Sequence, residues 1–256
     1  MTSPNSFSRH FARAACSVSI LCALTSAGMA ATLTINTTPY GNGNGLGGGE
    51  YTITSPTLSN AGYSSLVTSG FAVGAIQGFC LEYGENFAPG SSYSYTIGNA
   101  ATLGSGGAVA GSDLISNGTA WLYSQFATGT LANYSYAAAG RSASDSLLQL
   151  AFWYLEDETQ LISGYGSYDP NTNVFLSAAI TQFGSIAAAK TNAANSFGVV
   201  VLNLTSGNNV HNQSQLYYSP ESNTPVPDSG STLALMGIAS LGLMGITRRT
   251  SPGKSV

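Results

Sequence analysis

The chain is poor in positive charge. Seven of its 256 residues are lysine or arginine, against eleven that are acidic. Between residues 31 and 230 the acids remain but only two bases do, which gives that region a formal charge of −9. Such a surface repels nucleic acid and anionic lipid, so we expect no nucleic-acid partner. The two internal bases are Arg141 and Lys190, and the terminal ones are Arg9, Arg13, Arg248, Arg249 and Lys254.

Cysteine and histidine are also scarce. The whole chain has three cysteines and two histidines, and between residues 31 and 230 it keeps only Cys80 and His211. A single cysteine excludes an intramolecular disulfide, and one histidine beside it leaves no ordinary ligand set for zinc. We therefore expect no metal and no cofactor. His211 lies in an asparagine-rich stretch, which is typical of a surface turn.

The first 30 residues have the features of a secretory signal peptide. Arg9 and Arg13 precede the apolar run 14–27, and small residues follow at 27–31. The run is too short for an ordinary transmembrane helix, which needs about 20 residues. The pattern predicts cleavage near Ala30 or Ala31 and an exported protein.

The C-terminal part of the chain has a second hydrophobic segment behind a short motif. The motif is Val226-Pro227-Asp228-Ser229-Gly230. The apolar run after it predicts a short transmembrane helix at residues 231–247, and the basic residues Arg248 and Arg249 follow that helix. Basic residues after the apolar run would keep this end on the cytoplasmic side. The arrangement resembles the VPDSG variant of the PEP-CTERM sorting signals.

That resemblance implies a Gram-negative bacterium and processing of residues 223–256 by an exosortase-type enzyme. Before processing, the tail would hold the protein transiently in the inner membrane. Afterwards the protein would reach the cell envelope, the outer surface or the extracellular matrix, often in association with exopolysaccharide.

Residues 31–222 are long enough for one domain with a real core. Alternating and β-branched patterns predict strands at residues 32–36, 51–54, within 71–83, 92–97, 197–204 and 215–218. The glycine-rich segment 40–49 is expected to be a loop in which nothing packs. Together with the helices below, these elements predict an α+β fold, a mostly antiparallel sheet or sandwich with about three helices on one side.

Three segments have helical spacing. They are residues 120–127, a helix capped by Ser144 or Asp145 that runs to Leu155, and residues 172–190. The acids Glu156, Asp157 and Glu158 follow the second helix. We expect them to lie beyond its last turn, because acids there oppose the helix dipole, and to be solvated. They lack the spacing of a calcium loop.

Conventional catalytic sets are missing from the sequence. No Gly-x-Ser-x-Gly motif stands between a predicted strand and helix, so a serine hydrolase is not indicated. A glycan hydrolase would need two carboxylates at a defined separation, for which Glu82 with Glu85 or Glu156 are the candidates. We expect the protein not to be an enzyme, and name no catalytic residue.

A lone cysteine in an exported protein needs an explanation. It is either a buried, inert residue or a thiol committed to another covalent bond. Phe79-Cys80-Leu81-Glu82 and, 69 residues later, Gln149-Leu150-Ala151-Phe152-Trp153 together resemble the motifs of bacterial thioester domains found in surface adhesins. The resemblance covers about residues 78–158.

The resemblance implies an internal thioester between Cys80 and Gln149, shielded from water by Phe79, Phe152 and Trp153. It also implies covalent attachment to a nucleophile on a surface polysaccharide or on a protein of a host or neighbouring cell. The alternative is a structural or matrix protein of the envelope that has the same fold, no thioester and only non-covalent contacts.

Overall fold

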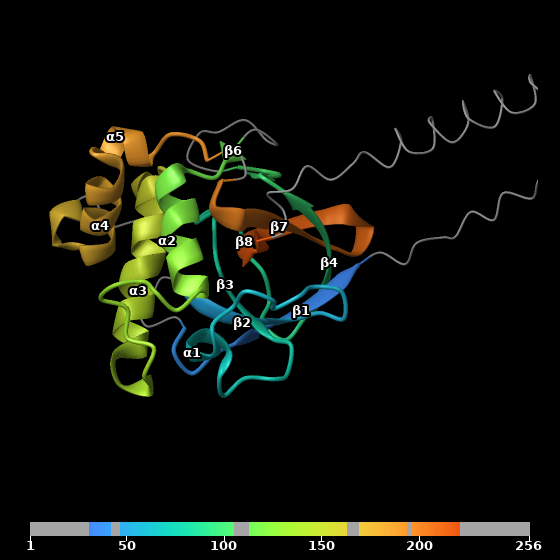
Figure 1. Ribbon diagram of the computed structural model, residues 1–256. Helices are drawn as coiled ribbons and strands as arrows, with labels where there is room; N and C mark the ends of the chain where they lie inside the picture. The colour runs from blue at the N-terminus through green and yellow to red at the C-terminus, as the bar shows by residue number, and fades with distance from the viewer. Residues whose placement is uncertain (1–30, 42–46, 105–112, 163–168, 194–195, 221–256) are drawn as a thin grey trace, which may run out of the picture.

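The computed structural model describes residues 31–41, 47–104, 113–162, 169–193 and 196–220. The predicted signal peptide (1–30) and the predicted sorting tail (223–256, with its helix at 231–247) lie outside these ranges. The described chain is α+β, as the sequence predicts, with helices gathered on one side of an antiparallel sheet (Figure 1).

The main sheet has six strands in the order β3-β2-β1-β4-β7-β8, and every pairing is antiparallel. Each predicted strand is present, and the last is longer than expected. The strands are β1 (Thr32–Thr37), β2 (Glu50–Thr54), β3 (Ile76–Phe79), β4 (Ser92–Gly98), β7 (Val199–Ser206) and β8 (Val210–Tyr218). A two-stranded sheet of β5 (Ala100–Ala101) and β6 (Asp113–Leu114) was not predicted, because two residues are too few to show a period.

The main sheet closes on itself. Its two outer strands meet where Cys80, directly after β3, bridges to Gln215 of β8. The N–H of Leu81 also donates to the carbonyl of Ser214 at 3.0 Å. Alternate side chains therefore point into an enclosed interior. That interior cluster contains Leu33, Ile35, Tyr51, Ile53, Ile76, Cys80, Tyr93, Tyr95, Leu150, Trp153, Ile162, Val200, Leu202, Leu204 and Tyr217.

The helices form a second core against the outside of the same sheet. The longer ones are α2 (Asn117–Ala127), α3 (Ala138–Leu155) and α4 (Val174–Phe183), with short α1 (Ser65–Thr68) and α5 (Ile186–Ala189) beside them (Figure 1). Ser116 caps α2 and Asn173 caps α4 through their side chains. Single 3₁₀ turns lie at Glu158–Leu161, Pro170–Thr172, Ser196–Gly198 and Gly207–Asn209.

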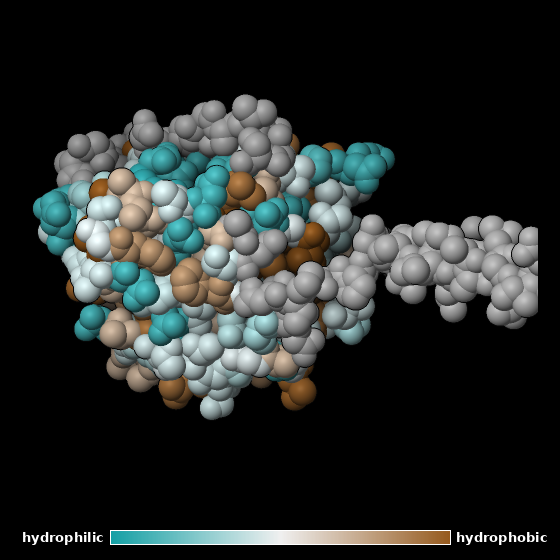
Figure 2. Space-filling model, turned by 45° about the horizontal axis from the view of Figure 1, so that its top comes forward, coloured by the Kyte–Doolittle hydropathy of each residue, from teal (hydrophilic) through white to brown (hydrophobic). Residues whose placement is uncertain are grey.

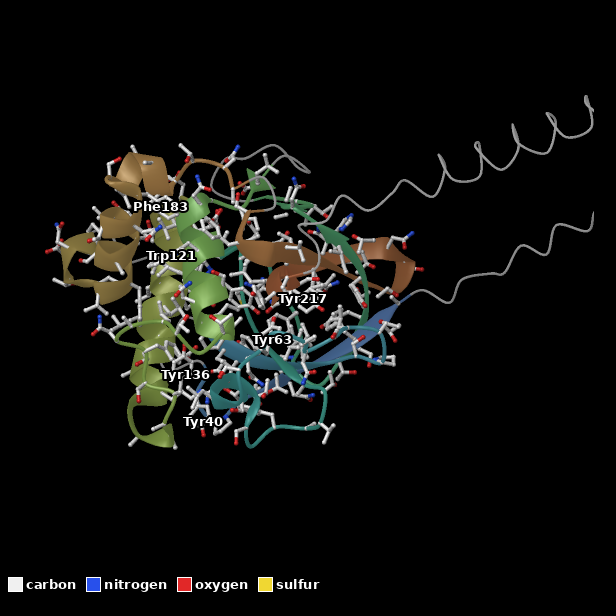
Figure 3. The ribbon with its side chains drawn as sticks, in the orientation of Figure 1. Tyr40, Tyr63, Trp121, Tyr136, Phe183 and Tyr217 are labelled. Atoms are coloured by element: carbon white, nitrogen blue, oxygen red, sulfur yellow. The ribbon has the colours of Figure 1, made fainter. Side chains whose placement is uncertain are left out.

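Aromatic rings fill the space between helices and sheet. Trp121 of α2 packs edge to face on Phe183 of α4, with ring centroids 6.3 Å apart, on the helical side (Figure 3). Tyr63 stacks on Tyr217 of β8 at 6.4 Å nearer the sheet (Figure 3). The tyrosine-rich composition is therefore used in part to pack one layer on the other.

The structure corrects three local predictions. Helix α3 begins at Ala138, ahead of Ser144 and Asp145, with a bend where Gly140 has φ of +93°; neither residue caps it, and both are buried. The third predicted helix is divided, because Gly184 adopts φ of +81° and Ser185 caps α5. His211 is exposed as predicted, but it lies in β8, paired with Thr205, two residues after the turn Gly207–Asn209.

On the face of the molecule drawn in Figure 2, hydrophilic and hydrophobic residues are interspersed. Exposed apolar side chains, among them Val73 and Val210, are scattered over different elements, which is ordinary for a protein surface. Within the described ranges, no helix combines the length and the apolar character that crossing a membrane requires.

Candidate functional site: the Cys80–Gln149 pair

Cys80 and Gln149 meet inside the protein. Cys80 follows β3 at the closure of the sheet, Gln149 lies in the middle of α3, and both side chains are fully buried. Their 69-residue separation is bridged because α3 packs against the sheet at the end of β3.

Three hydrogen bonds fix the carboxamide of Gln149. Its Nε2 donates to the carbonyl of Cys80 at 2.8 Å. Its Oε1 accepts the backbone N–H of Gly49 at 2.8 Å and that of Cys80 at 3.2 Å. The side chain therefore has one orientation, with its carbonyl oxygen under two backbone donors.

Two N–H groups aimed at one carbonyl oxygen are the arrangement that stabilises an oxyanion when a nucleophile adds to the carbonyl carbon. Cys80, the residue that supplies one of the two donors, also carries a thiol. The site thus brings together an acyl group, donors for its oxygen and a thiol.

The thiol of Cys80 is neutral in this setting. Burial raises its pKa to about 12, and a contact with Gln215 opposes part of that rise. Nε2 of Gln215 lies 3.7 Å from Sγ. A buried neutral thiol reacts slowly, because the thiolate is the nucleophilic form.

The glycine-rich segment covers the pair, which corrects the prediction that nothing in it packs. Gly48 and Gly49 are buried. A Cβ placed on Gly48 would lie 2.4 Å from Cη2 of Trp153 and 2.8 Å from Cγ of Gln149, so only glycine fits. Trp153 and Gly48 together separate Gln149 from solvent.

The aromatic residues predicted to shield the pair divide between the two cores. Trp153 shares the interior cluster with Cys80. Phe79 and Phe152 pack on each other at 5.3 Å in the helical core, on the other side of β3. Tyr83, whose ring centroid lies 5.0 Å from that of Trp153, adds to the cover on the Cys80 side.

A buried ion pair supports the backbone that reaches Gln149. Glu50, the residue after Gly49, accepts two hydrogen bonds from Arg141 and a third from the hydroxyl of Tyr134 at 3.0 Å. Its own N–H donates to Oδ1 of Asp145. These contacts fix the position of Gly49 and hence the donor that it offers.

The acids after α3 are only partly as predicted. The helix ends at Leu155, so they lie beyond its last turn as expected. However, Glu156 and Glu158 are buried, and Asp157 alone is exposed. Ser116 donates to Glu156 through both its hydroxyl and its N–H, which explains how this carboxyl is accommodated in the interior.

The carboxylates considered for glycan hydrolysis are placed as follows. Glu82 lies with Asp113 and Glu158 in a group whose carboxylate oxygens are within 4.8 Å of one another. Glu85 accepts the N–H of Ser214 at 2.8 Å, and Glu156 faces Ser116. All three candidates are buried.

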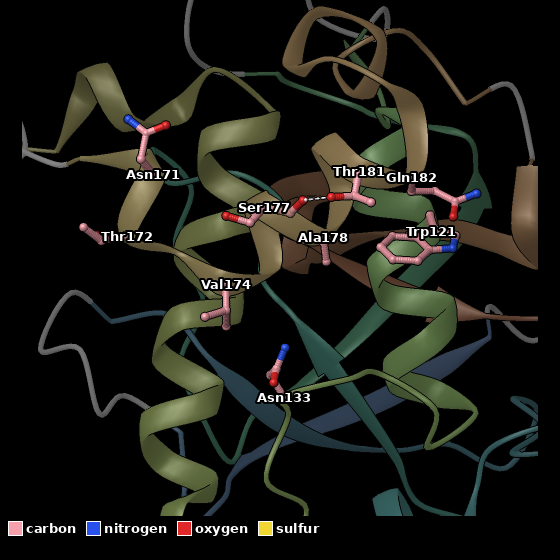
Figure 4. Close-up of a pocket in the computed structure, with 9 residues that line it drawn as sticks. All are labelled: Trp121, Asn133, Asn171, Thr172, Val174, Ser177, Ala178, Thr181 and Gln182. Carbon is pink, nitrogen blue, oxygen red and sulfur yellow. Dashed lines mark hydrogen bonds between the residues drawn. The ribbon is translucent and has the colours of Figure 1, made fainter.

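A separate hollow of about 540 Å³ lies on the helical side (Figure 4). Its described lining carries no charged side chain. The side-chain amides of Asn133 and Gln182 and the ring of Trp121 line it beside hydroxyl groups of α4 (Figure 4). The carboxylates considered for hydrolysis therefore do not line this hollow.

The comparison with known protein families concerns the C-terminal part of the chain. Residues 225–250 match the VPDSG-CTERM motif. The chain carries a VPDSG-CTERM sorting motif. It is therefore an exported cell-surface protein whose tail is processed by an exosortase-type enzyme, as the sequence predicts. The residues of the motif, Val226, Pro227, Asp228, Ser229 and Gly230, lie outside the described ranges.

No curated protein and no solved structure matches the chain. The VPDSG-CTERM motif covers the tail alone, so the assignment of the folded domain rests on its own geometry.

Sequence reasoning missed several residues of the site. Gly49, Glu50 and Arg141 gave no local signal, because their contacts join segments far apart in the chain. Asp145 was interpreted as a helix cap. The signal that would have located it is its spacing, since residues four apart on a helix share one face, and Gln149 is four residues on.

Proposed function

We propose that this VPDSG-CTERM protein is an adhesin-like surface protein that forms an internal thioester between Cys80 and Gln149 and then attaches covalently to a target. The observation that carries the proposal is the position of the Gln149 carbonyl oxygen, 2.8 Å and 3.2 Å from two backbone N–H donors, next to the cysteine of the exported region.

Formation of the bond is a condensation. Sγ of Cys80 adds to the carboxamide carbon of Gln149, negative charge develops on Oε1 under the Gly49 and Cys80 N–H groups, and ammonia leaves. The product is an acyl group activated toward amines and hydroxyls. Trp153 and the Gly48 backbone exclude water from it, which supports a lifetime long enough to meet a target.

Attachment follows when a nucleophile of a surface polysaccharide, or of a protein on a host or neighbouring cell, attacks the same carbonyl carbon. The Cys80 thiol is released, and Gln149 becomes the acyl half of a permanent bond. Each molecule reacts once, so the protein acts as a covalent binder and not as an enzyme. No cofactor takes part in this chemistry.

Sparse internal amines support the proposal. Lys190 is the one lysine between residues 31 and 230, and its Nζ is engaged with Asp157 and lies 4.5 Å from the ring centroid of Tyr154. The one lysine amine that could compete for the acyl group is thus engaged at the C-terminal end of α3.

The competing candidate is a non-covalent matrix protein with the same fold. The observation that favours it is the raised pKa of the Cys80 thiol, which suits an inert buried cysteine. Intact mass separates the two candidates. The thioester predicts a mature protein lighter than its sequence by one ammonia, which gains one methylamine on treatment and then exposes one alkylatable thiol.

Two variants make that measurement specific. Cys80→Ala has no thiol and Gln149→Glu has no ammonia to lose, so both should keep the mass of their sequences. Wild-type protein with its sequence mass and an alkylatable Cys80 from the start would refute the thioester. Hydrolysis during purification must be checked first, because it leaves glutamate at position 149.

A further inference from the structure

Asp145 and Gln149 hold two consecutive backbone groups from the same face of α3. Gln149 accepts the N–H of Gly49, and Asp145 accepts the N–H of Glu50 through Oδ1. The residues are one helical turn apart, so their side chains act together on a single stretch of backbone. Asp145 therefore helps to determine where the Gly49 donor points.

The second carboxyl oxygen of Asp145 has an unusual environment. Asp145 is fully buried, and its Oδ2 makes no hydrogen bond to any residue that the structure describes. A buried oxygen without a partner costs free energy, about 1–3 kcal/mol for a neutral group and more for a charged one. The arrangement therefore disfavours the anionic form of Asp145.

Several ionisable groups face Asp145 from the elements around it. They are Glu50 and Tyr51 of β2, Arg141 of α3, Tyr134 before α3, and Cys80 after β3. Burial, followed by the charge of Glu50, raises the pKa of Asp145 to about 8, while the Glu50 N–H and Arg141 oppose that rise. Asp145 is consequently neutral at pH 7.

The same geometry links Asp145 to the thiol. An anionic Asp145 raises the pKa of Cys80, because two negative charges in an apolar interior repel each other. Charge on the Gln149 oxyanion would meet the same repulsion. Ionisation of Asp145 therefore opposes each charged species along the condensation path.

We propose that Asp145 is a positioning residue of the Cys80–Gln149 pair that makes thioester formation dependent on pH. As a neutral acid it holds the Gly49–Glu50 backbone against Gln149, and as an anion it slows the condensation. This inference rests on the proposed thioester and adds its regulation: above the pKa of Asp145, the condensation is slower than it would be with an uncharged residue at this position.

The chemistry balances without any other reactant. The bond from Sγ of Cys80 to Cδ of Gln149 forms, the bond from Cδ to Nε2 breaks, and the thiol proton departs with the nitrogen as ammonia. The reverse reaction consumes ammonia and restores both side chains. Excess ammonia therefore resets the mature protein to the thiol and carboxamide, from which condensation can be timed.

The test is to reset the mature protein with ammonia, remove the ammonia, and follow the loss of one ammonia by intact mass from pH 6 to pH 10. Wild type is compared with Asp145→Asn, which keeps an oxygen acceptor and cannot ionise, and with Asp145→Ala, which has no acceptor. Asp169→Asn, which alters an exposed aspartate that caps the 3₁₀ turn Pro170–Thr172, is the matched control.

We expect the ratio of the condensation rate of Asp145→Asn to that of wild type to rise by about tenfold as pH passes 8. Repulsion from the Asp145 charge that shifts a pKa by about one unit corresponds to a tenfold change in rate. At pH 6, Asp145→Asn should condense faster than Asp145→Ala. The Asp169→Asn ratio should not change with pH.

A constant Asp145→Asn ratio across this range would overturn the inference while leaving the thioester intact, and so would Asp145→Ala condensing as fast as wild type at pH 6. If Asp145→Ala fails to fold, the Asp145→Asn ratio decides. Wild-type protein that loses no ammonia at any pH would refute the proposed thioester itself.

Discussion

Arg141 and Glu50 form a bidentate ion pair in the interior, with Nε 2.9 Å from Oε2 and Nη2 2.5 Å from Oε1. Arg141 also donates to the carbonyls of Leu66, Tyr136 and Val67. One of the two cations between residues 31 and 230 thus joins α1, α3 and β2 next to the Cys80–Gln149 pair.

Removing one partner of this ion pair should strongly destabilise the domain. We expect Arg141→Met to lower the free energy of unfolding by about 3–5 kcal/mol, because it leaves Glu50 buried with an uncompensated charge. Urea denaturation measures the loss. Lys190→Met removes the partially exposed pair with Asp157 and should cost no more than about 1 kcal/mol. Equal losses in the two variants would contradict the role given to Arg141.

Gly48→Ala should disturb the cover over Gln149. Its new Cβ would overlap the ring of Trp153, so either the ring or the loop must move, at a cost of about 1–3 kcal/mol. If the thioester forms, the variant should also react with methylamine faster than wild type. Gly207→Ala is the control, because a Cβ there meets no atom within 4 Å. Unchanged stability and reactivity in Gly48→Ala would show that the segment packs differently.

Glu156 should make stability depend on pH. Burial raises its pKa from 4.5 to about 7, with Thr119 and Ser116 opposing that rise. The folded state therefore binds this proton more tightly than the unfolded chain does. The resulting stability is full below pH 4.5 and is lost as pH rises to about 7, by up to about 3 kcal/mol.

Glu156→Gln should remove that dependence, because the amide oxygen can accept from Ser116 and does not ionise. The difference in unfolding free energy between the variant and wild type should grow between pH 4.5 and pH 7 and then stay constant. Asp157→Asn, which alters the exposed neighbour, should show no such change. Parallel curves for wild type and Glu156→Gln would mean that Glu156 stays ionised in the fold.

The sorting motif predicts a clear cellular result. Replacing Pro227, Asp228 and Ser229 together by alanine should prevent processing of residues 225–250, so that the uncut protein stays in the membrane fraction. Immunoblotting of cell fractions measures this by size and location. The Cys80→Ala variant serves as the control, since it should be processed and exported as wild type is. Normal surface display of the triple variant would contradict sorting through the motif.

The sequence predicted the elements whose signal is local. The Val199-Val200-Val201-Leu202 run marked β7, and the spacing of apolar residues marked α3. The Cys80–Gln149 meeting was suggested by two motifs in order, while the structure supplied the distances. The predicted helix over residues 172–190 was wrong at one point, because the left-handed backbone of Gly184 ends α4 there. The pattern of apolar residues continues past Gly184 and gives no sign of this break.

The rest of the site depends on contacts that no sequence window contains. Gly49 and Gln149 are 100 residues apart, and Glu50 and Arg141 are 91 residues apart. Glu158 looked solvated because acids beside a helix end usually are, but its carboxylate accepts the N–H of Tyr83 at 2.9 Å in the interior. Tertiary structure decided each case.

The bridge between Cys80 and Gln215 also bears on the order in which the surroundings of Cys80 are completed during folding. The two residues are separated by 135 positions, and closing so long a loop costs conformational entropy before the contact can stabilise the fold. A chain that enters the envelope from its N-terminus delivers Cys80 and Gln149 well before β8. The wall around the thiol is therefore completed only after the last strand of the sheet has arrived, so the order of folding delays the proposed condensation until export is nearly finished.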